Sequence, residues 1–548
     1  MTADALAGLP STVAAVFEAT ATALPGNDFL QVLPETAAIL GVEARTWSYA
    51  EAAVEIARLS AMYSAAGYGH GHRAGLLLLN RPEFIFHFIA LNQLGISVVP
   101  INPDWRAAEL EFLIAHSEIS VAACIPGREQ VLLTAAGAVG RDVALAGPHA
   151  APLRRATATA RDAGRVPDAD TECALLYTSG TTGQPKGCVL PNEYFLYAGR
   201  WYNTVGGLCD VRRGVERMLT PLPLTHMNAM AVSTMCMTLS GGCLVLLDRF
   251  HPATWWESVR LSRATIIHYL GVMPAMLLGL PASNADRSHN VRFGFGAGVN
   301  PRHHAVFEDR FGFPLLEAWA MTETGSGAVV VANREPRHVG TACFGAALPD
   351  VLCRVVTEGG EDAPPGVPGE LFVRHAGSDP KFGFFRCYLK DDAATAQAWA
   401  GGWFHTGDLV SRQIDGTFRF VDRKKNVIRR SGENISAVEV ESVIAQHPDV
   451  RAIGVTAVPD PVRGDEVFGC VVLRPGVAAN DDWAAQLSNF CRRRLAYYKA
   501  PGYVAFCAAL PLTPTEKIQR SKLKQLALDL WDRGEFVDVR SMKRRDEE

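Results

Sequence analysis

The chain has 548 residues, of which 48% are hydrophobic and 20% are charged, as is ordinary for a globular protein. This length exceeds what one hydrophobic core supports, so several lobes are expected. A net charge of -4 gives no reason to expect a nucleic acid or an anionic membrane surface as partner. The twelve cysteines follow no paired pattern, and residues 1–20 lack the basic and apolar regions of a secretory signal. We therefore expect reduced thiols in a cytoplasmic protein.

Short apolar runs alternate with helical periodicity along most of the chain. A strand at 72–79, a helix at 82–94 and a strand at 96–100 form a strand–helix–strand unit. Further strands are predicted at 173–176, 265–269, 291–295 and 370–374. Apolar strands separated by helices are typical of a parallel sheet that is covered on both faces. The predicted fold class is therefore α/β, with layered sheets and helices.

The segment at 227–247 is uncharged and long enough to span a bilayer. It is interrupted by hydroxyl residues, by Asn228 and by the pair Gly241-Gly242. A buried helix, a glycine turn and a strand at 243–247 explain this composition better than a membrane span does. We predict no membrane span.

The composition changes at a basic turn, Asp422-Arg423-Lys424-Lys425-Asn426. After this turn, helices are predicted at 437–446 and 483–495, and strands at 452–457 and 467–473. About a hundred residues with their own helices and strands are enough for an independent α+β domain. We therefore predict an N-terminal domain at 1–423 and a small C-terminal domain at 424–548.

A glycine-rich loop follows the strand predicted at 173–176. Its sequence is Tyr177-Thr178-Ser179-Gly180-Thr181-Thr182-Gly183-Gln184-Pro185-Lys186-Gly187. Glycines let backbone N–H groups converge on an anion, and the hydroxyls and the lysine add donors suited to phosphate. The loop is not a Walker A motif, because Pro185 precedes the lysine and Gly187 follows it. Taken alone, the segment is equally compatible with an ordinary surface loop.

Further motifs follow the loop in order along the chain. They lie at 221–228, 294–298, 319–324, 403–408, 422–426, 432–435 and 514–518. Each has an ordinary structural explanation: Asp408 as a turn residue, Lys517 as an exposed lysine, Glu323 as a helix cap, His226 as a packing histidine. Only their occurrence in one ordered pattern argues for a common site.

In this order the motifs resemble those of the adenylate-forming superfamily, which includes acyl-CoA synthetases, luciferases and peptide-synthetase adenylation domains. The resemblance covers 46–523, nearly the whole chain. It implies that a carboxylate reacts with ATP to give an acyl-adenylate and pyrophosphate, and that a thiol then displaces AMP. It also implies a large N-terminal domain, a mobile C-terminal lid, and ATP, Mg²⁺ and coenzyme A as ligands.

The resemblance assigns roles residue by residue. The groups that would hold the β- and γ-phosphates of ATP are Thr178, Ser179, Gly180, Thr181, Thr182, Gly183 and Lys186. Thr322 would contact the α-phosphate, and Glu323 would bind Mg²⁺ beside the phosphates. The nucleoside would be held by Gly296, Ala297, Gly298, Trp319, Asp408 and Arg423, with Trp319 on the adenine and the last two on the ribose.

Three residues after 423 are assigned to the lid. Lys517 would neutralise charge between the carboxylate and the α-phosphate during adenylation. Lys425 lies at the family's hinge position, where backbone dihedrals would change as the lid swings. Gly432 lies on the face that would meet the thiol in the second lid orientation.

The acyl pocket would be lined, besides Trp319 and the turn at 296–297, by His226, Met227, Asn228, Tyr269, Gly271, Val272, Phe295 and Ala320. Met227 stands where amino-acid-activating relatives have an aspartate, which argues against an α-amino acid. Ala320 replaces the glycine that is usual in the family, and its methyl group should narrow the pocket. A short or medium acid with a polar group, or a small aromatic acid, fits this lining. The motifs after 421 look closest to those of crotonobetaine/carnitine–CoA ligases.

Free CoA is the expected acceptor, because about thirty residues after Lys517 leave no room for a fused carrier domain. A stand-alone enzyme that loads a separate carrier protein remains an alternative. A luciferase-like oxygenase is more remote, and a non-enzymatic binding module would require a damaged site. A homodimer is left open.

Overall fold

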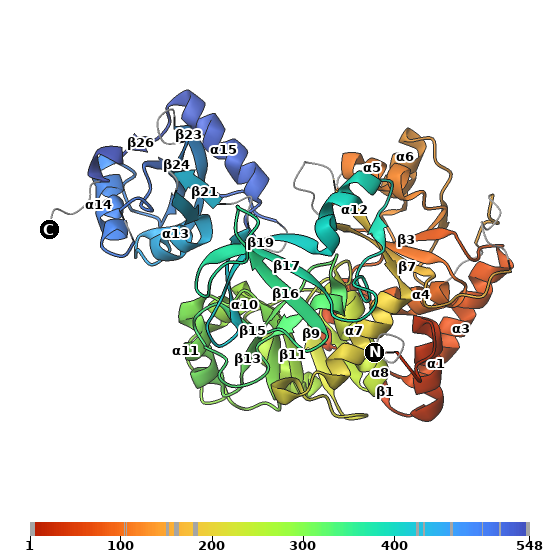
Figure 1. Ribbon diagram of the computed structural model, residues 1–548. Coiled ribbons are helices and arrows are strands. Elements are labelled where there is room, and N and C mark those ends of the chain that lie inside the picture. The colour runs from red at the N-terminus through yellow and green to blue at the C-terminus, as the bar shows by residue number, and fades with distance from the viewer. Residues whose placement is uncertain are drawn as a thin grey trace. The chain divides into compact units, whose positions relative to one another are not determined.

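The computed structural model divides the chain into two compact units (Figure 1). One unit comprises Met1–Cys353 and Val373–His405, and the other comprises Arg354–Phe372 and Thr406–Glu548. The structure describes residues 6–103, 105, 107–149, 153–157, 164–178, 185–423, 427–430, 433–460, 464–495, 497–513 and 517–543. The domain boundary expected between 423 and 424 stays a prediction, because residues 424–426 lie outside the described residues.

A seven-stranded sheet forms one layer of the first unit. Its strands, in spatial order, are β18 (Cys387–Tyr388), β8 (Lys186–Pro191), β7 (Glu172–Thr178), β4 (Ser97–Pro100), β3 (Arg73–Leu77), β5 (Val121–Cys124) and β6 (Ala144–Ala146). The strands from β7 to β6 pair in parallel, whereas β7, β8 and β18 pair antiparallel. The strands predicted at 72–79, 96–100 and 173–176 are confirmed as β3, β4 and β7.

Helices α4 (Pro82–Gln93), α5 (Ala107–Ser117) and α6 (Glu129–Ala138) follow β3, β4 and β5 in the sequence. Helix α4 begins at a proline, which suits a first turn because no intrahelical bond needs its missing N–H. The apolar faces of α5 and α6 pack on the sheet through a core that includes Leu113 and Leu132. This alternation of strand and helix confirms the predicted α/β class.

The second sheet of this unit brings together strands that lie far apart in the sequence. Their order is β14 (Val330–Val331), β13 (Leu315–Trp319), β12 (Phe293–Ala297), β11 (Ile266–Leu270), β9 (Arg217–Thr220), β10 (Cys243–Leu246), β1 (Asp28–Val32) and β2 (Thr46–Ser48). The strands from β13 to β1 are parallel, and β15 (Cys343–Ala346) pairs with β14. Residues that follow β11, β12 and β13 therefore meet at one edge of the sheet.

The remaining helices of the first unit are α1 (Val13–Ala23), α2 (Pro34–Leu40), α3 (Tyr49–Ala65), α7 (Asn192–Thr204), the π-helix η2 (Asn228–Ser233), α8 (Thr234–Ser240), α9 (Trp255–Ser262), α10 (Val272–Leu278), α11 (Pro301–Phe311) and α12 (Asp392–Ala398). The helix, glycine turn and strand predicted over 227–247 are confirmed, since η2 and α8 end at Gly241 and β10 follows. Within the described residues, no helix has the length and apolar character needed to cross a membrane.

The second unit contains β20 (Thr417–Arg423) and parts of β16 (Val351–Val356), β17 (Pro368–His375) and β19 (Phe404–Arg412). Its other sheet has the order β22 (Glu433–Ser436), β21 (Val427–Arg430), β24 (Gly464–Leu473), β25 (Tyr503–Phe506) and β26 (Val537–Asp538), with β23 (Val450–Asp460) beside β24. Helices around this sheet are α13 (Ala437–Ile444), α14 (Asp481–Arg492) and α15 (Arg520–Arg533) (Figure 1). The helices and strands predicted after the basic turn are confirmed.

Two glycines let the carboxyl ends of β11 and β12 approach each other closely. A Cβ atom on Gly271 would lie 1.7 Å from the carbonyl oxygen of Gly298. A Cβ atom on Gly296 would lie 2.3 Å from the carbonyl oxygen of Tyr269. Both distances are far below van der Waals contact with rigid backbone, so bare backbone is required at this edge of the sheet.

Gly271→Ala should therefore destabilise the protein by about 1–3 kcal/mol, the usual effect of overpacking a tight contact. Denaturant unfolding measures this change. The matched control is Gly137→Ala in α6, where a Cβ would meet nothing within 4 Å. The control should be neutral or slightly stabilising, because alanine favours helix over glycine. Equal unfolding midpoints for the two variants would contradict the close approach.

Candidate active site

The predicted site residues divide between the two units. The first unit holds Thr178, Lys186, His226, Met227, Asn228, Tyr269, Gly271, Val272, Phe295, Gly296, Ala297, Gly298, Trp319, Ala320, Thr322 and Glu323. The second holds Asp408, Arg423 and Lys517. Ser179, Gly180, Thr181, Thr182, Gly183, Lys425 and Gly432 lie outside the described residues.

Strands β7 and β8 hold the two ends of the glycine-rich loop. Thr178 is the last residue of β7, Lys186 is the first of β8, and the two are register partners in this antiparallel pair. The Lys186 ammonium lies 4.7 Å from the centre of the Tyr388 ring. An aromatic face attracts a cation, so Tyr388 helps to fix the lysine at the loop's end.

The same tyrosine contacts the carboxylate expected to bind magnesium. The hydroxyl of Tyr388 donates a hydrogen bond of 2.9 Å to Oε1 of Glu323, which is 7% exposed. Burial and the neighbouring Glu323 raise the pKa of Tyr388, so its hydroxyl stays protonated and remains a donor. Mg²⁺ usually takes one or two carboxylates together with phosphate oxygens, and Glu323 beside Lys186 and Tyr388 fits that pattern.

Thr322 is fixed through its backbone. The hydroxyl of Tyr194, on α7, donates to the carbonyl oxygen of Thr322 at 2.9 Å. The next turn is closed by Thr324, whose Oγ1 accepts from the N–H of Met321 at 3.0 Å. These two bonds position the Thr322–Glu323 segment after β13 from both sides.

The edge formed by β11, β12 and β13 collects the predicted acyl and adenine residues. Tyr269 is register partner to Gly296 and is buried in the hydrophobic core, with its hydroxyl donating to Glu317 at 2.8 Å. Ala297, Gly298 and Ala320, by contrast, are exposed just beyond the strand ends. Ligands of parallel sheets bind at such carboxyl ends, which agrees with the predicted position of the site.

Glu317 organises the turn after β12. Its carboxylate accepts from the N–H groups of Gly298 at 2.9 Å and of Val299 at 3.2 Å, as well as from Tyr269. Burial raises the pKa of Glu317, and these three donors act against that shift. The turn that was predicted to contact the nucleoside is therefore held by a buried carboxyl group.

In the second unit, sheet pairing places Asp408 opposite Arg423. The two residues are register partners in the antiparallel β19–β20 pair, and Nε of Arg423 lies 2.6 Å from Oδ1 of Asp408. The hydroxyl of Thr406 accepts from the Asp408 N–H at 3.0 Å and donates to the carbonyl of Leu371 at 2.7 Å. The expected ribose pair is thus brought together, and its carboxylate has a fixed direction.

Lys517 lies next to a small backbone bridge. Its N–H donates to Oγ1 of Thr513, its carbonyl accepts from the Thr513 N–H, and Leu512 bridges to Ile518. Part of the Lys517 side chain remains exposed to solvent. Loss of hydration and repulsion from Arg423 nevertheless lower its pKa from the ordinary lysine value.

Sequence reasoning missed four residues that support the site: Tyr388, Tyr194, Glu317 and Thr406. Tyr388 and Tyr194 are single aromatic residues outside the motifs used, and only tertiary contacts bring them to Glu323 and Thr322. Glu317 and Thr406 each lie two residues before a predicted site residue. Residues two apart in a strand point to the same side of the sheet, and this spacing is the one sequence signal that could have indicated Glu317 and Thr406.

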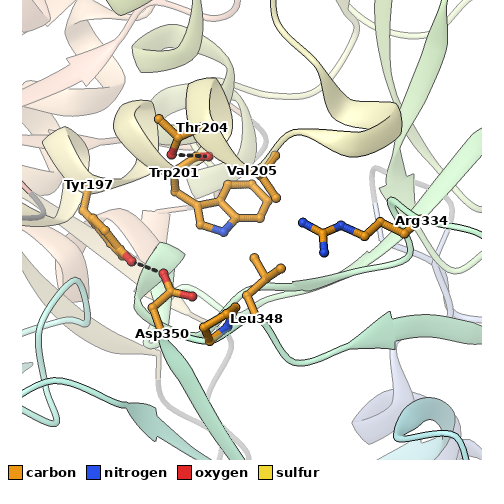
Figure 2. A pocket seen from close by; sticks show the side chains of 8 residues that line it. Tyr197, Trp201, Thr204, Val205, Arg334, Leu348 and Asp350 are labelled. Atoms are coloured by element: carbon orange, nitrogen blue, oxygen red, sulfur yellow. Dashed lines mark hydrogen bonds between the residues drawn. The ribbon is translucent and has the colours of Figure 1, made fainter.

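A separate cavity lies beside the end of α7. It has a volume of about 200 Å³ and is lined by Tyr197, Trp201, Thr204, Val205, Arg334, Leu348, Pro349 and Asp350 (Figure 2). The Tyr197 hydroxyl donates to Oδ2 of Asp350 at 2.5 Å. None of the predicted site residues lines this cavity.

The fold and these polar groups match what the ordered motifs predict, an enzyme that binds a nucleotide and its phosphates. The AMP-binding enzyme family matches residues 27–389, and the AMP-binding enzyme C-terminal domain matches residues 439–517. The chain belongs to the AMP-binding enzyme family. The resemblance predicted from the ordered motifs is confirmed.

Curated relatives align along most of the chain. A sulfoacetate–CoA ligase from Cupriavidus necator is 30% identical over 520 residues, which cover 90% of this chain and 98% of the relative. A crotonobetaine/carnitine–CoA ligase from Shigella flexneri is 31% identical over 500 residues, covering 87% and 93%. The predicted enzyme class, an AMP-forming acid–thiol ligase, is confirmed at the level of these relatives.

Solved structures agree on the fold. ATP-bound MatB from Rhodopseudomonas palustris superposes with a TM-score of 0.79 at 24% identity, covering 94% of this chain and 99% of that one. An o-succinylbenzoate CoA synthetase from Bacillus subtilis, in complex with its acyl-adenylate intermediate, gives 0.77 at 23% identity, covering 93% and 97%. The predicted arrangement of a large N-terminal domain and a smaller C-terminal domain is confirmed.

Tyr388→Phe keeps the ring beside Lys186 and removes only the hydroxyl. We expect a loss of about 1–3 kcal/mol of stability, because the buried Glu323 carboxylate loses a donor, together with a raised KM for Mg-ATP. Denaturant unfolding and steady-state kinetics measure the two effects. Tyr197→Phe, which also removes a tyrosine–carboxylate bond, should leave the KM for Mg-ATP unchanged. An unchanged KM for Mg-ATP in Tyr388→Phe would show that the Tyr388 hydroxyl does not contribute to binding of Mg-ATP.

Acyl-adenylate formation should decline at alkaline pH as Lys517 loses its proton, at a lower pH than an ordinary lysine would give. Arg423→Gln removes one of the two causes of the lowered pKa, so the alkaline limb should move to higher pH. The pH profile of pyrophosphate release measures the limb independently of the absolute rate. Arg419→Gln removes a charge from the same strand and should leave the limb in place. If the alkaline limb of the pH profile does not move in Arg423→Gln, Arg423 is not a cause of the lowered pKa of Lys517.

Proposed function

We propose that the protein is an acyl-CoA synthetase that converts a small carboxylic acid, ATP and CoA into an acyl-CoA, AMP and pyrophosphate. The acid first attacks the α-phosphate to form an acyl-adenylate, with pyrophosphate as leaving group. The CoA thiol then attacks the acyl carbon and AMP leaves. The observation that carries the proposal is the pair of family matches, combined with polar groups at every described position where this chemistry needs one.

In the first step the phosphates need compensating charge and a fixed direction. Lys186, with the loop at 178–183, would supply cationic and hydrogen-bonding contacts to the β- and γ-phosphates. Glu323 would hold Mg²⁺, which lowers the repulsion between the phosphates and the incoming carboxylate. Thr322 would contact the α-phosphate where the bond changes take place.

The second unit would contribute the ribose and charge-neutralising groups. Asp408, held by Arg423 and Thr406, has carboxylate oxygens suited to the two ribose hydroxyls. Lys517 would stabilise the charge that builds up between carboxylate and α-phosphate. Lys425 as hinge and Gly432 at the thiol-facing surface complete this proposal, with the lid presenting a different face in each half-reaction.

The acid is proposed to be short or medium in length and to carry a polar group, or to be a small aromatic acid. Met227 offers no carboxylate for an α-amine, and the Ala320 methyl group takes up space where the lining would otherwise be glycine. The two curated relatives act on acids of opposite character, since a sulfonate is anionic and a trimethylammonium group is cationic. A carrier protein as acceptor is not favoured, because both relatives are CoA ligases.

The test is pyrophosphate release with Mg-ATP across short-chain, trimethylammonium, aromatic and long-chain acids, each with and without CoA. Formation of acyl-CoA from an acid that triggers release supports the proposal. Release that leaves a bound acyl-adenylate and ignores CoA contradicts CoA as acceptor. A cytoplasmic enzyme, with a homodimer left open, is part of the same proposal.

Lys517→Ala should reduce acyl-adenylate formation by at least about 100-fold, because a transition-state cation is lost, while ATP still binds. ATP–pyrophosphate exchange and equilibrium ATP binding separate the two effects. CoA transfer from synthetic acyl-adenylate should change much less. Lys499→Ala, a lysine of the same domain that pairs with Glu439 at 2.7 Å, is the control. Exchange at the wild-type rate in Lys517→Ala would exclude this lysine from the first step.

A further inference from the structure

A π-helical turn brings two polar side chains to one place at the edge of the acyl site. Element η2 runs from Asn228 to Ser233, and the Ser233 hydroxyl donates to the carbonyl oxygen of Asn228, five residues earlier, at 3.1 Å. π-Helical turns are rare in proteins, and those that occur are often found at functional sites. Here it places Ser233 and the Asn228 side chain against the same partner, His268 of β11.

His268 is buried and contacts three polar groups. Its Nδ1 lies 2.7 Å from Oδ1 of Asn228 and 3.0 Å from Oγ of Ser233, and its Nε2 lies 3.1 Å from the Tyr202 hydroxyl. The His268 side chain is 0% exposed. Burial lowers the pKa of His268 to about 3, so the ring is neutral at physiological pH.

With Oδ1 of Asn228 facing Nδ1 of His268, one assignment of protons satisfies all of these contacts. The Ser233 hydroxyl already uses its proton on the Asn228 carbonyl, so it faces His268 with a lone pair. Nδ1 must therefore carry the ring proton and share it between Ser233 Oγ and Asn228 Oδ1. Nε2 then accepts from Tyr202. Because Oδ1 faces the histidine, the Asn228 amide nitrogen points the other way.

The amide nitrogen of Asn228 is left available to a ligand. Asn228 is partly exposed, and among the described residues no group accepts a hydrogen bond from its Nδ2. The His268 ring centre lies 5.2 Å from that of Phe295, on the neighbouring strand. Beyond those strands, Ala297 and Gly298 are exposed. The two N–H donors of this amide are thus unused within the described residues, on a side chain whose histidine partner packs against Phe295 of the predicted acyl lining.

We propose that the Asn228 amide, oriented by His268, donates to an oxygen acceptor on the part of the acid away from the reacting carboxylate. This inference rests on the proposed acyl-CoA synthetase function. Asn228 is the specificity residue, and His268 and Tyr202 are positioning residues that act through it. The acceptor class is shared by a sulfonate, a second carboxylate and an uncharged sulfone or carbonyl. A trimethylammonium or hydrocarbon group lacks it.

Four acids of nearly the same shape test this proposal, since each carries a tetrahedral group on the same CH₂–COO⁻ unit. Sulfoacetate and methylsulfonylacetate have acceptor oxygens, with and without charge. Tert-butylacetate and glycine betaine have no acceptor oxygen on this group. The tert-butyl group is neutral and the trimethylammonium group is cationic. For the wild-type enzyme we expect kcat/KM in acyl-CoA formation to be higher by about tenfold or more for the two acceptor acids.

Substitutions in the Asn228–His268–Tyr202 network test whether it causes the preference for the acceptor acids. Asn228→Leu keeps the side-chain volume and removes the donors, so the preference should fall by about tenfold, mostly through poorer use of the acceptor acids. Tyr202→Phe should lower the same ratio partially while leaving kcat/KM for tert-butylacetate close to the wild-type value. Tyr197→Phe removes a hydroxyl from the same helix on the side of the cavity in Figure 2, and should change neither quantity.

The outcomes separate this inference from the proposed function. If no acid in the wider panel gives acyl-CoA, the proposed function fails, and the inference fails with it. If tert-butylacetate, glycine betaine or a plain hydrocarbon acid is used as well as the acceptor acids, the inference fails while the synthetase function stands. A preference for sulfoacetate that is not shared by methylsulfonylacetate, or that survives Asn228→Leu, also overturns it.

Discussion

Parallel pairing of β9, β11, β12 and β13 is the constraint on which the rest of the site depends. Strands that run the same way end at the same edge, so the residues that follow them meet although long stretches of sequence separate them. The close approach of β11 and β12 requires bare backbone at Gly271 and Gly296. Phe295, Ala297 and Trp319 come to the ends of neighbouring strands through this pairing, although they lie apart in the sequence.

Buried polar groups then give that edge its chemistry, because each must find partners once water is excluded. Glu317 holds the turn after β12 through two backbone N–H groups, and Tyr388 fixes the direction of Glu323. His268 settles the direction of the Asn228 amide in the same way. In each case a buried partner fixes the orientation of a neighbouring residue that is predicted to belong to the site.

The two units contribute different chemistry. The first holds Lys186, the buried Glu323 carboxylate and the residues proposed for the acyl lining, and the second holds the Asp408–Arg423 pair and Lys517. Loss of hydration and repulsion from Arg423 lower the pKa of Lys517, so a negative charge brought beside it would stabilise its cation. Membership of the AMP-binding enzyme family explains why both sets occur in one chain.

The sequence by itself determined the family, the α/β class, most strands and helices, and the identity of residues such as Lys186, Glu323, Asp408 and Lys517. Periodicity and motifs are patterns of residues that lie close together in the sequence, and these features depend on such residues. Only the tertiary structure decided that Tyr388 contacts Glu323, that Glu317 holds the 298–299 turn, and that Oδ1 of Asn228 meets His268. Those facts depend on pairings across 65, 19 and 40 residues, which arise from packing and leave no pattern in the neighbouring sequence.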